Sequence, residues 1–322
     1  MRYKVIAFLL LILTAVDLAE AQQAKVSRIG YLGATTPGSA PAEAFRQGLR
    51  DLGYVEGKNI IIEYRYAEGV NERFANLAAE LVSLKVDVIL TGGTPATQAA
   101  KNATQTVPIV MVNTVDPVGT GLVASLARPG GNITGLTNVS GEFAGKLLEL
   151  LKEAFPKVSR VAVLWDPANA GNALSLGEIK VAARALQITL QSAEVHGPDD
   201  FEPAFSAIKK ERAGGLIVLR NVIASAYLAR IVDSTAKSRL PTMYTQSDYV
   251  DAGGLMSYGP NLANLYRRAA VYVDKILKGT KPAELPVEQP TKFEFIINLK
   301  AAKQIGLTIP PTVLARADKV IK

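Results

Sequence analysis

The sequence predicts an α/β protein with two doubly wound lobes, each built on a parallel sheet, joined by crossovers that act as a hinge. Short aliphatic runs alternate with helix-forming runs, which is typical of parallel sheets covered by helices on both faces. The order of these elements from Ser27 repeats from Ser159, an offset of 132, and Pro108 recurs as Pro241, an offset of 133. A chain of 322 residues is long enough for two such lobes.

Four strands and three helices are predicted in the first half. The strands are short, rich in β-branched residues, and end in glycine or polar loops; they cover residues 28–32, 59–69, 86–93 and 107–118. The segments between them carry apolar residues at helical spacing and cover residues 42–54, 71–85 and 94–104. Asn71 suits the cap of the second helix.

The second half repeats this order. Its predicted strands cover residues 159–169, 189–195, 214–221 and 240–250. Its predicted helices cover residues 179–188, 198–213 and 224–239. An element order that repeats at a constant offset indicates two copies of one architecture rather than one large sheet.

The tail differs from both halves. A strand-like return at 252–259 precedes a long helix at 261–279, where Gly279 suits the C-terminal cap. A proline-rich connector at 280–290 and a strand and helix at 292–311 follow. The chain therefore crosses between lobes more than once. We expect one lobe from residues 22–137 plus 259–285, and the other from 138–258 plus 286–322.

The N-terminus predicts a cleaved secretory signal peptide over residues 1–21. Arg2 and Lys4 precede an apolar run at 5–16, and Ala19-Glu20-Ala21 forms a small-residue cleavage site. The run is too short to span a bilayer comfortably, although an uncleaved anchor is the alternative. The mature chain is expected in the periplasm, and because it has no cysteine, disulfides, thiol catalysis and cysteine-bound metals are excluded.

The net charge of +7 raises the question of nucleic-acid binding. Lysines and arginines are scattered, and no basic run of five or more occurs. Sequence-independent binding to DNA needs a clustered basic surface. Nucleic acid is therefore not an expected partner.

The candidate ligand-binding residues follow the strands. Open α/β sheets bind ligands at the carboxyl ends of their strands, and two lobes would turn these edges toward a shared cleft. Such residues are Thr35, Thr36, Thr94, Pro95, Asp116, Asp166, Asn169, Arg220, Asn221, Tyr244 and Tyr258.

The turn Gly92-Gly93-Thr94-Pro95 leads from a predicted strand into a predicted helix. Thr94 suits the helix cap, and Pro95 suits the first helical position. Free N–H groups and the helix dipole can hold an anion there. The lysine of a phosphate-binding Walker loop is absent, as is the Gly-x-Gly-x-x-Gly dinucleotide pattern. A well-capped helix without a ligand is the alternative.

Three other candidates have two interpretations each. Asp116 before Pro117 is common turn chemistry, or a carboxylate for a ligand ammonium. Arg220 suits a ligand carboxylate, or pairs with an acid of its own lobe. Tyr258 stacks on a ligand, or fills the core.

A catalytic function finds little support. His196 precedes a predicted surface loop, and the Gly-x-Ser-x-Gly and His-Glu-x-x-His motifs are absent. No cofactor or metal site is predicted, and the chain is not expected to be an enzyme.

Several long stretches resemble the substrate-binding proteins of ABC transporters with the type 1 periplasmic-binding fold, the group related to tryptophan- and tyrosine-type binding proteins. The stretches are "AFRQGLRDLGYVEGKNIIIEYRYAEG", "DVILTGGTPATQAAK", "VPIVMVNTVDPVGTGLVASLARPGGNITGL" and the segment from "AGGLMSYG" to "IGLTIP". The resemblance implies a receptor, expected to be a monomer, that closes on a small ligand and delivers it to a membrane permease and ATPase.

By matching positions, the resemblance implies ligand contacts at Thr35, Thr94, Asp116, Asn138, Asn169 and Tyr258. The chain departs from the family at Asp166, where asparagine is common, and at Arg220-Asn221, where an aspartate is usual. These departures imply a second-lobe wall suited to a more anionic or differently shaped ligand. An exported enzyme on the same scaffold and a ligand sensor of a signalling system remain the alternatives.

Overall fold

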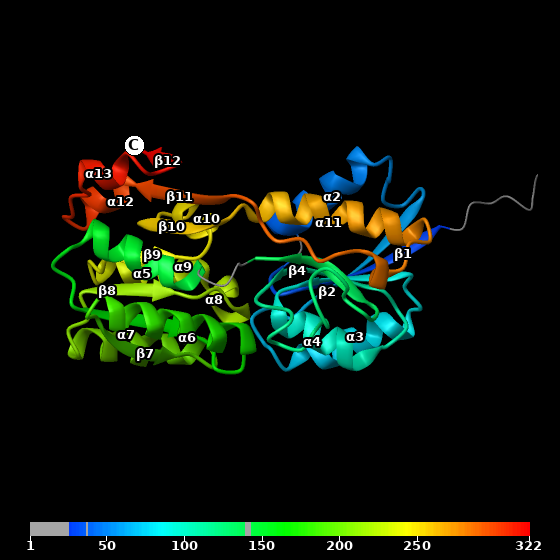
Figure 1. Ribbon diagram of the computed structural model, residues 1–322, viewed down its shortest axis with the longest axis horizontal. Helices are drawn as coiled ribbons and strands as arrows, with labels where there is room; N and C mark the ends of the chain where they lie inside the picture. Colours follow the sequence, from blue (N-terminus) through cyan, green and yellow to red (C-terminus); the bar gives the residue numbers. More distant parts are fainter. Residues whose placement is uncertain (1–25, 37, 139–142) are drawn as a thin grey trace, which may run out of the picture.

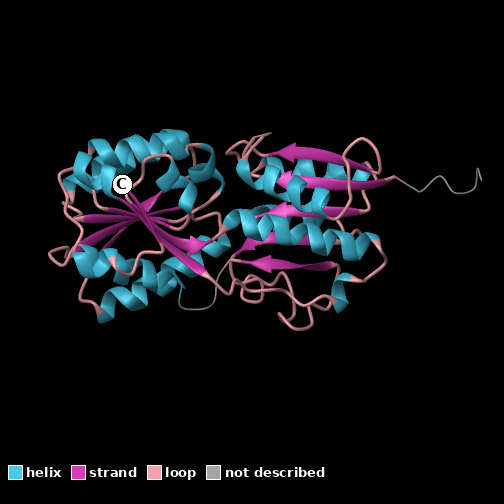
Figure 2. Ribbon diagram, turned by 90° about the horizontal axis from the view of Figure 1, so that it is seen from above, coloured by secondary structure: helices cyan, strands magenta, loops and turns pink. Residues whose placement is uncertain are grey.

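The computed structural model describes residues 26–36, 38–138 and 143–322, and these residues form two α/β lobes that lie side by side (Figure 1). Figure 2 shows strands and helices in both lobes, viewed at 90° to the first figure. The predicted signal peptide at 1–21 lies outside the described residues.

The first lobe is built on a parallel sheet of five described strands in the order β2-β1-β3-β4-β5. The strands are β1 (Ser27–Gly33), β2 (Ile60–Tyr66), β3 (Val88–Gly92), β4 (Ile109–Thr114) and β5 (Ile133–Thr137). One face packs against α2 (Ala40–Asp51) and α11 (Leu262–Leu277). The other packs against α3 (Arg73–Ser83) and α4 (Thr94–Ala103).

In the second lobe, the described strands form a sheet in the order β12-β11-β10-β9-β8-β6-β7. The strands are β6 (Arg160–Trp165), β7 (Thr189–Glu194), β8 (Gly215–Val218), β9 (Thr242–Tyr244), β10 (Met256–Pro260), β11 (Phe293–Asn298) and β12 (Lys319–Ile321). β10 and β11 run antiparallel, and the other paired strands run parallel.

Helices cover both faces of this second sheet as well. One face carries α5 (Phe143–Ala154), α6 (Ala170–Ala185), α12 (Leu299–Gln304) and α13 (Pro311–Leu314). The other carries α7 (Phe201–Lys210), α8 (Val222–Ala226), α9 (Leu228–Lys237) and α10 (Ser247–Asp251). Two 3-10 turns complete the described elements, η1 (Pro198–Asp200) and η2 (Pro282–Glu284).

The predicted fold class is confirmed. The order β2-β1-β3-β4-β5 in the first lobe is matched by β7-β6-β8-β9-β10 in the second. The strand pair β11 and β12 then extends the second sheet beyond the repeated unit. Two sheets with the same strand order, each covered on both faces, are two doubly wound lobes.

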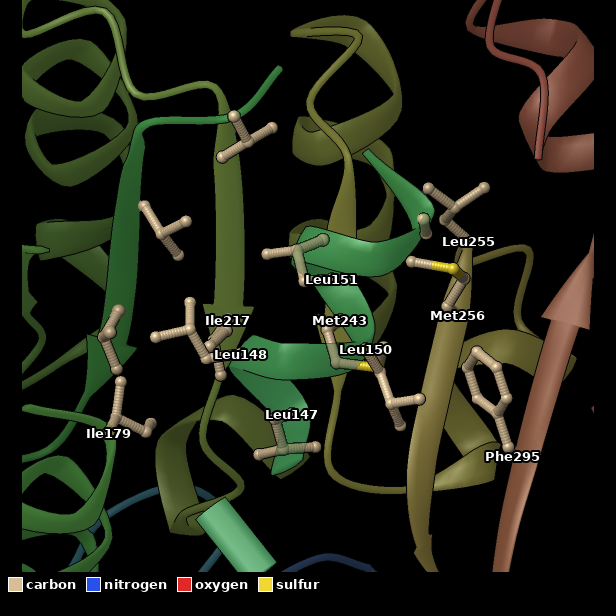
Figure 3. Close-up of a cluster of buried hydrophobic side chains, with 14 of the residues drawn as sticks. Leu147, Leu148, Leu150, Leu151, Ile179, Ile217, Met243, Leu255, Met256 and Phe295 are labelled. Carbon is tan, nitrogen blue, oxygen red and sulfur yellow. The ribbon is translucent and has the colours of Figure 1, made fainter. Parts of the chain in front are cut away.

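The core of the second lobe shows why one face of its sheet is apolar (Figure 3). Leu147, Leu148 and Leu151 of α5 lie against Ile217 and Met243 of the sheet, and all five side chains are buried. Burial of a leucine-sized side chain stabilises the fold by roughly 1.5–3 kcal/mol. The α5 helix therefore anchors the sheet whose strand ends carry the second wall of the site.

Between the elements that the structure describes, the chain passes from one lobe to the other three times. It leaves β5 for α5, returns from β10 to α11, and leaves again between Val287 and β11. Figure 1 shows α11 on the first lobe, although the strands before and after it along the chain, β10 and β11, belong to the second lobe. The phenol of Tyr54 donates a hydrogen bond of 2.9 Å to Asp274 of α11, which fixes this late helix on the first lobe.

Several element boundaries differ from the sequence-based expectation. The helix expected from residue 179 begins at Ala170, because the side chain of Asn169 caps it by accepting from two backbone N–H groups. The expected helix at 224–239 is divided into α8 and α9. The expected strand at 240–250 is the three-residue β9 followed by α10. The predicted elements include neither strand β5 nor helix α5.

In the part of the chain that the structure describes, no helix combines the length and apolar character needed to cross a membrane.

Candidate ligand-binding site between the lobes

A cavity lies between the lobes at the carboxyl ends of their strands. Its first-lobe wall includes Thr35 after β1, Gly93 after β3 and Asn113 at the end of β4. Its second-lobe wall includes Asn169 after β6 and Arg220 after β8. These are the edges at which open parallel sheets bind ligands.

The turn at Gly92-Gly93 forms the start of α4 at this cavity. Gly93 is the N-cap residue with φ of 87°, a left-handed conformation that favours glycine. A Cβ atom on Gly92 would lie 2.5 Å from the Tyr266 hydroxyl, so only glycine leaves room for that phenol. The free N–H groups at the start of α4 therefore line the cavity beside a buried hydroxyl.

Thr94 is not the cap of α4, contrary to expectation, but its first residue, and Pro95 is the second. The Thr94 hydroxyl oxygen accepts a hydrogen bond of 3.2 Å from the Val115 amide. It thereby joins the end of β4 to the start of α4. Gly93 is the N-cap residue instead, because its left-handed backbone makes the turn from β3 into α4.

Tyr31 and Tyr266 form a buried hydroxyl pair in the first-lobe wall. Their ring centroids lie 6.4 Å apart. Burial raises the pKa of both phenols above the ordinary value of tyrosine. Both therefore stay neutral at physiological pH and offer hydroxyl groups rather than phenolates to this region.

Arg220 lines the cavity from the second lobe. It forms an ion pair with Asp248 in which Nη1 donates to Oδ2. Burial acts to lower the pKa of the Arg220 guanidinium, but Asp248 outweighs this effect and raises the pKa above its ordinary value. Arg220 is thus a fixed positive charge in the wall, since arginine in any case stays protonated.

Three asparagines hold the second-lobe wall in place. Asn221 caps α8 by accepting a hydrogen bond of 2.7 Å from the backbone N–H of Ala224, and its side-chain amide donates a hydrogen bond to Asn172. Asn172 in turn donates 3.0 Å to the carbonyl of Arg220, and Asn169 caps α6. The backbone around Arg220 is therefore rigidly positioned.

Seven of the twelve predicted site residues line this cavity. They are Thr35, Thr94, Pro95, Asn138, Asn169, Arg220 and Asn221. The other five, Thr36, Asp116, Asp166, Tyr244 and Tyr258, lie outside its lining.

Two of the outlying residues belong to aromatic clusters. Tyr244 is fully buried, stacks on Tyr249 at 4.7 Å, and shares a hydrogen bond of 2.8 Å with Thr235. Tyr258 stacks between Phe143 at 5.8 Å and Phe293 at 5.6 Å. Both tyrosines therefore contribute to packing in the second lobe.

The other polar residues are placed by local bonding. Asp116 is exposed, and its carboxylate accepts a hydrogen bond of 2.8 Å from the Gly119 amide, which is the turn chemistry of an Asp-Pro sequence. Thr36 is also exposed.

Asp166 bonds across the lobes instead of lining the cavity. Its fully buried carboxylate accepts a hydrogen bond of 2.7 Å from the amide of Asn71 in the first lobe. The expectation that Asn71 caps α3 is therefore wrong, because its side chain is directed to Asp166 and Glu72 is the cap residue. A second interlobe bond of 3.4 Å joins the amide of Gln246 to Asn113.

The ABC transporter substrate binding protein family matches residues 39–321. The chain belongs to this family.

Individual members support the assignment. This substrate-binding protein is 27% identical over 266 residues to a tyrosine-binding protein of Clostridioides difficile, covering 82% of this chain and 76% of that one. A conserved domain protein of Vibrio cholerae has a similar structure, with a TM-score of 0.84 and 32% identity over 92% of this chain and all of that one. A Streptococcus pneumoniae ABC domain in complex with L-Trp also has a TM-score of 0.84, with 28% identity, 92% coverage of this chain and 99% of that one.

Some cavity residues of this substrate-binding protein were missed by the sequence analysis as ligand candidates. Tyr31 lies within a predicted strand, and Tyr266 lies within the late helix, where both resemble ordinary core residues. Asn113, the penultimate residue of β4, has φ of 59°, a conformation that asparagine tolerates better than most residues. An asparagine at a strand end was the available signal, whereas nothing local marks Tyr266.

The part of this substrate-binding protein that the structure describes contains neither a metal-ligating cluster nor a buried histidine. Within residues 26–36, 38–138 and 143–322, no group of three or more His, Asp or Glu side chains is placed to hold a metal ion. His196 is exposed, and its backbone N–H donates to Asp200 in a surface loop.

The Asn71–Asp166 bond leads to a prediction about the relative position of the lobes. Asn71→Ala removes a hydrogen bond to a charged group, which is worth about 1.5–3 kcal/mol, and this bond exists only when the lobes are in contact. We expect the variant to sample more open conformations, seen as a larger radius of gyration in small-angle X-ray scattering. Asn76→Ala, at an exposed position of α3, the helix that follows Asn71, is the matched control. Identical scattering from both variants would exclude this role for Asn71.

Proposed function

We propose that this protein is the extracytoplasmic receptor of an ABC importer and captures a small polar or amino-acid-like ligand between its two closing lobes. Its relatives include proteins described as a tyrosine-binding protein and as a complex with L-Trp. The family assignment supports the receptor role, and the hydrogen-bonding groups of the cavity lining support a polar ligand.

The observation that carries this proposal is the cavity itself. Both walls contribute hydrogen-bonding groups to one space, the first through Thr35 and the start of α4, the second through Arg220. A ligand that contacts both walls binds the closed arrangement more tightly than the open one, and therefore shifts the population toward closure. The lobes proposed to close are residues 22–137 plus 259–285 and residues 138–258 plus 286–322.

An exported enzyme on the same scaffold is the alternative. It would need a nucleophile, an acid–base pair or a metal at the cavity, and the described walls offer hydroxyls, amides and one paired arginine instead. Burial raises the pKa of Tyr31 and Tyr266, so both hydroxyls stay protonated at neutral pH and the phenolate form that could act as a base is scarcely present. We therefore place the receptor first.

A binding screen separates the receptor from the enzyme. Purified mature protein is screened by thermal shift against amino acids, organic acids and aromatic compounds, and each hit is titrated by isothermal calorimetry. We expect saturable binding of one ligand per chain, with the ligand recovered chemically unchanged. Conversion of a hit into product would support the enzyme.

The partners of the receptor are proposed to be a membrane permease and an ATPase, with the mature chain exported to the periplasm as a monomer. Addition of the ligand-loaded protein to the permease and ATPase in proteoliposomes should stimulate ATP hydrolysis. A ligand sensor would bind its ligand equally well but leave this ATPase rate unchanged.

A further inference from the structure

The charge of the cavity walls is one-sided. Among the described residues that line the cavity, Arg220 is the only charged one, and none is aspartate or glutamate. The rest of the polar lining consists of hydroxyls, side-chain amides and backbone groups. A ligand in this space therefore meets one positive charge and no negative one from the described walls.

Two carboxylates lie close behind the second-lobe wall, and both are engaged. Asp248 accepts from the Arg220 guanidinium and also from the amide of Tyr249. Asp166 accepts from Asn71 and from the Ala168 amide. Asp116 is exposed and bonded to the Gly119 amide, away from the cavity lining. None of the three is placed to receive a positively charged group of a ligand in this cavity.

The same walls favour a negative group. The ten-residue helix α4 begins at the cavity with Gly93 and Thr94, and the sixteen-residue helix α6 begins there with Asn169 as its cap. Helix N-termini carry partial positive charge, and α4 adds unpaired N–H groups, whereas the N–H groups of Gly171 and Asn172 in α6 are bonded to Asn169. Arg220 adds a full charge, and among the described residues none accepts a hydrogen bond from its Nε or Nη2 atoms, so they are available to a carboxylate.

Asn138 sets a second requirement for the ligand, a hydrogen-bond donor. Its side-chain oxygen is buried and has no hydrogen-bond partner among the described residues, although the residue lines the cavity. Its backbone N–H donates 3.1 Å to Thr114, which fixes its position at the end of β5. A buried acceptor without a partner is costly, so the ligand is expected to bring a donor to this oxygen. An amide oxygen accepts from a hydroxyl, but it carries no charge to balance an ammonium.

We infer that the cavity selects a small organic acid that carries a neutral donor such as a hydroxyl, in preference to the amino acid of the same shape. The carboxylate of the ligand binds Arg220 and the N-terminal end of α4, and the neutral donor of the ligand donates a hydrogen bond to Asn138 Oδ1. This inference rests on the proposed receptor function and narrows its ligand class.

The physical reason is the cost of removing an ammonium group from water. A buried charge is tolerated when it is paired and hydrogen-bonded, and it is costly otherwise. A hydroxyl at the same position needs only the single acceptor that Asn138 provides. We therefore expect a preference of about tenfold or more for the hydroxy acid, which corresponds to about 1.4 kcal/mol.

The test uses matched pairs in which a hydroxyl replaces the ammonium. L-tryptophan is compared with indole-3-lactate, L-tyrosine with 4-hydroxyphenyllactate, and L-leucine with 2-hydroxyisocaproate, each by calorimetric titration of the mature protein. We expect at least one hydroxy acid to bind about tenfold or more tightly than its partner.

A single substitution is expected to shift this preference toward the amino acid. Asn138→Asp places a carboxylate at the same position, so the preference should move toward the amino acid by about tenfold or more. Asn76→Asp, which adds the same charge at an exposed position of α3, should leave the preference unchanged. Melting temperatures of both variants check that each is folded.

The outcomes are distinct. Tighter or equal binding of the amino acids by the unmodified protein overturns the inference and leaves the receptor function standing. The same holds if no member of any pair binds while another, ammonium-bearing compound does. Chemical conversion of a bound compound would instead overturn the receptor function.

Discussion

An Arg220→Met variant is expected to lose at least about 100-fold in affinity for the ligand that saturates the unmodified protein. Arg220 is the charged residue among the described residues of the cavity wall, and its position is fixed by Asp248, Thr245 and Asn172. Hydrogen bonds to charged groups contribute about 1.5–3 kcal/mol each, so the loss of two amounts to roughly 3 kcal/mol or more. Calorimetric titration measures the change directly.

Arg184→Met removes an exposed arginine from the same lobe and serves as the control. Arg220→Lys keeps the charge but loses the planar fork that suits a carboxylate, and should fall between the two. Because Asp248 loses its partner, each variant is first shown to be folded by circular dichroism. A folded Arg220→Met protein with unchanged affinity would show that Arg220 belongs to the lobe rather than to the ligand.

Gly135→Ala is expected to lower the free energy of unfolding by about 3 kcal/mol or more. Gly135 lies in β5 with φ of 132°, a conformation that L-residues rarely adopt. A Cβ atom there would also lie 2.1 Å from the backbone oxygen of Met111 in the neighbouring β4. Backbone strain of this kind costs about 1–3 kcal/mol, and overpacking adds a similar amount. Urea denaturation followed by circular dichroism measures the effect.

Gly131→Ala is the matched control, since a Cβ atom at Gly131 meets no atom within 4 Å. It should change the free energy of unfolding by less than about 0.5 kcal/mol. Equal stability of the two variants would mean that β4 and β5 separate enough to accept the methyl group. The position of Asn138, three residues after Gly135, would then be less firmly fixed than the contacts indicate.

The fold was largely predictable because its signals are local. Aliphatic runs such as Val161–Leu164 are buried strands in the structure, and the constant offset between halves predicted two sheets of the same order. Strand β5 was not anticipated, because Ile133-Thr134-Gly135-Leu136 contains a glycine and is short. Its formation depends on pairing with β4, and a pairing partner is not visible in a local window.

The candidate site was predictable only in part. Strand ends can be read from the sequence, and Thr35, Asn169 and Arg220 do reach the cavity. Tyr244 is the last residue of β9, but its ring is directed into the core beside Tyr249. The direction of a side chain at a strand end depends on one residue of register, which a sequence does not fix.

Tyr266 shows the opposite limit. It is separated from Tyr31 by more than 200 residues, and it reaches the cavity only because α11 returns to the first lobe. Within its helix it has the spacing of any buried residue. Recognition of such a residue requires knowledge of which lobe the late helix covers.

The return of α11 to the first lobe also has a consequence for biosynthesis. The helix packs on α2, and Tyr54 bonds Asp274 across 220 positions of sequence. Because a chain is made from its N-terminus, the first lobe lacks one of the two helices that cover one face of its sheet until residue 277 has been made. Contacts of such long sequence separation slow folding. The nascent chain therefore has no complete first lobe until most of its residues have been made.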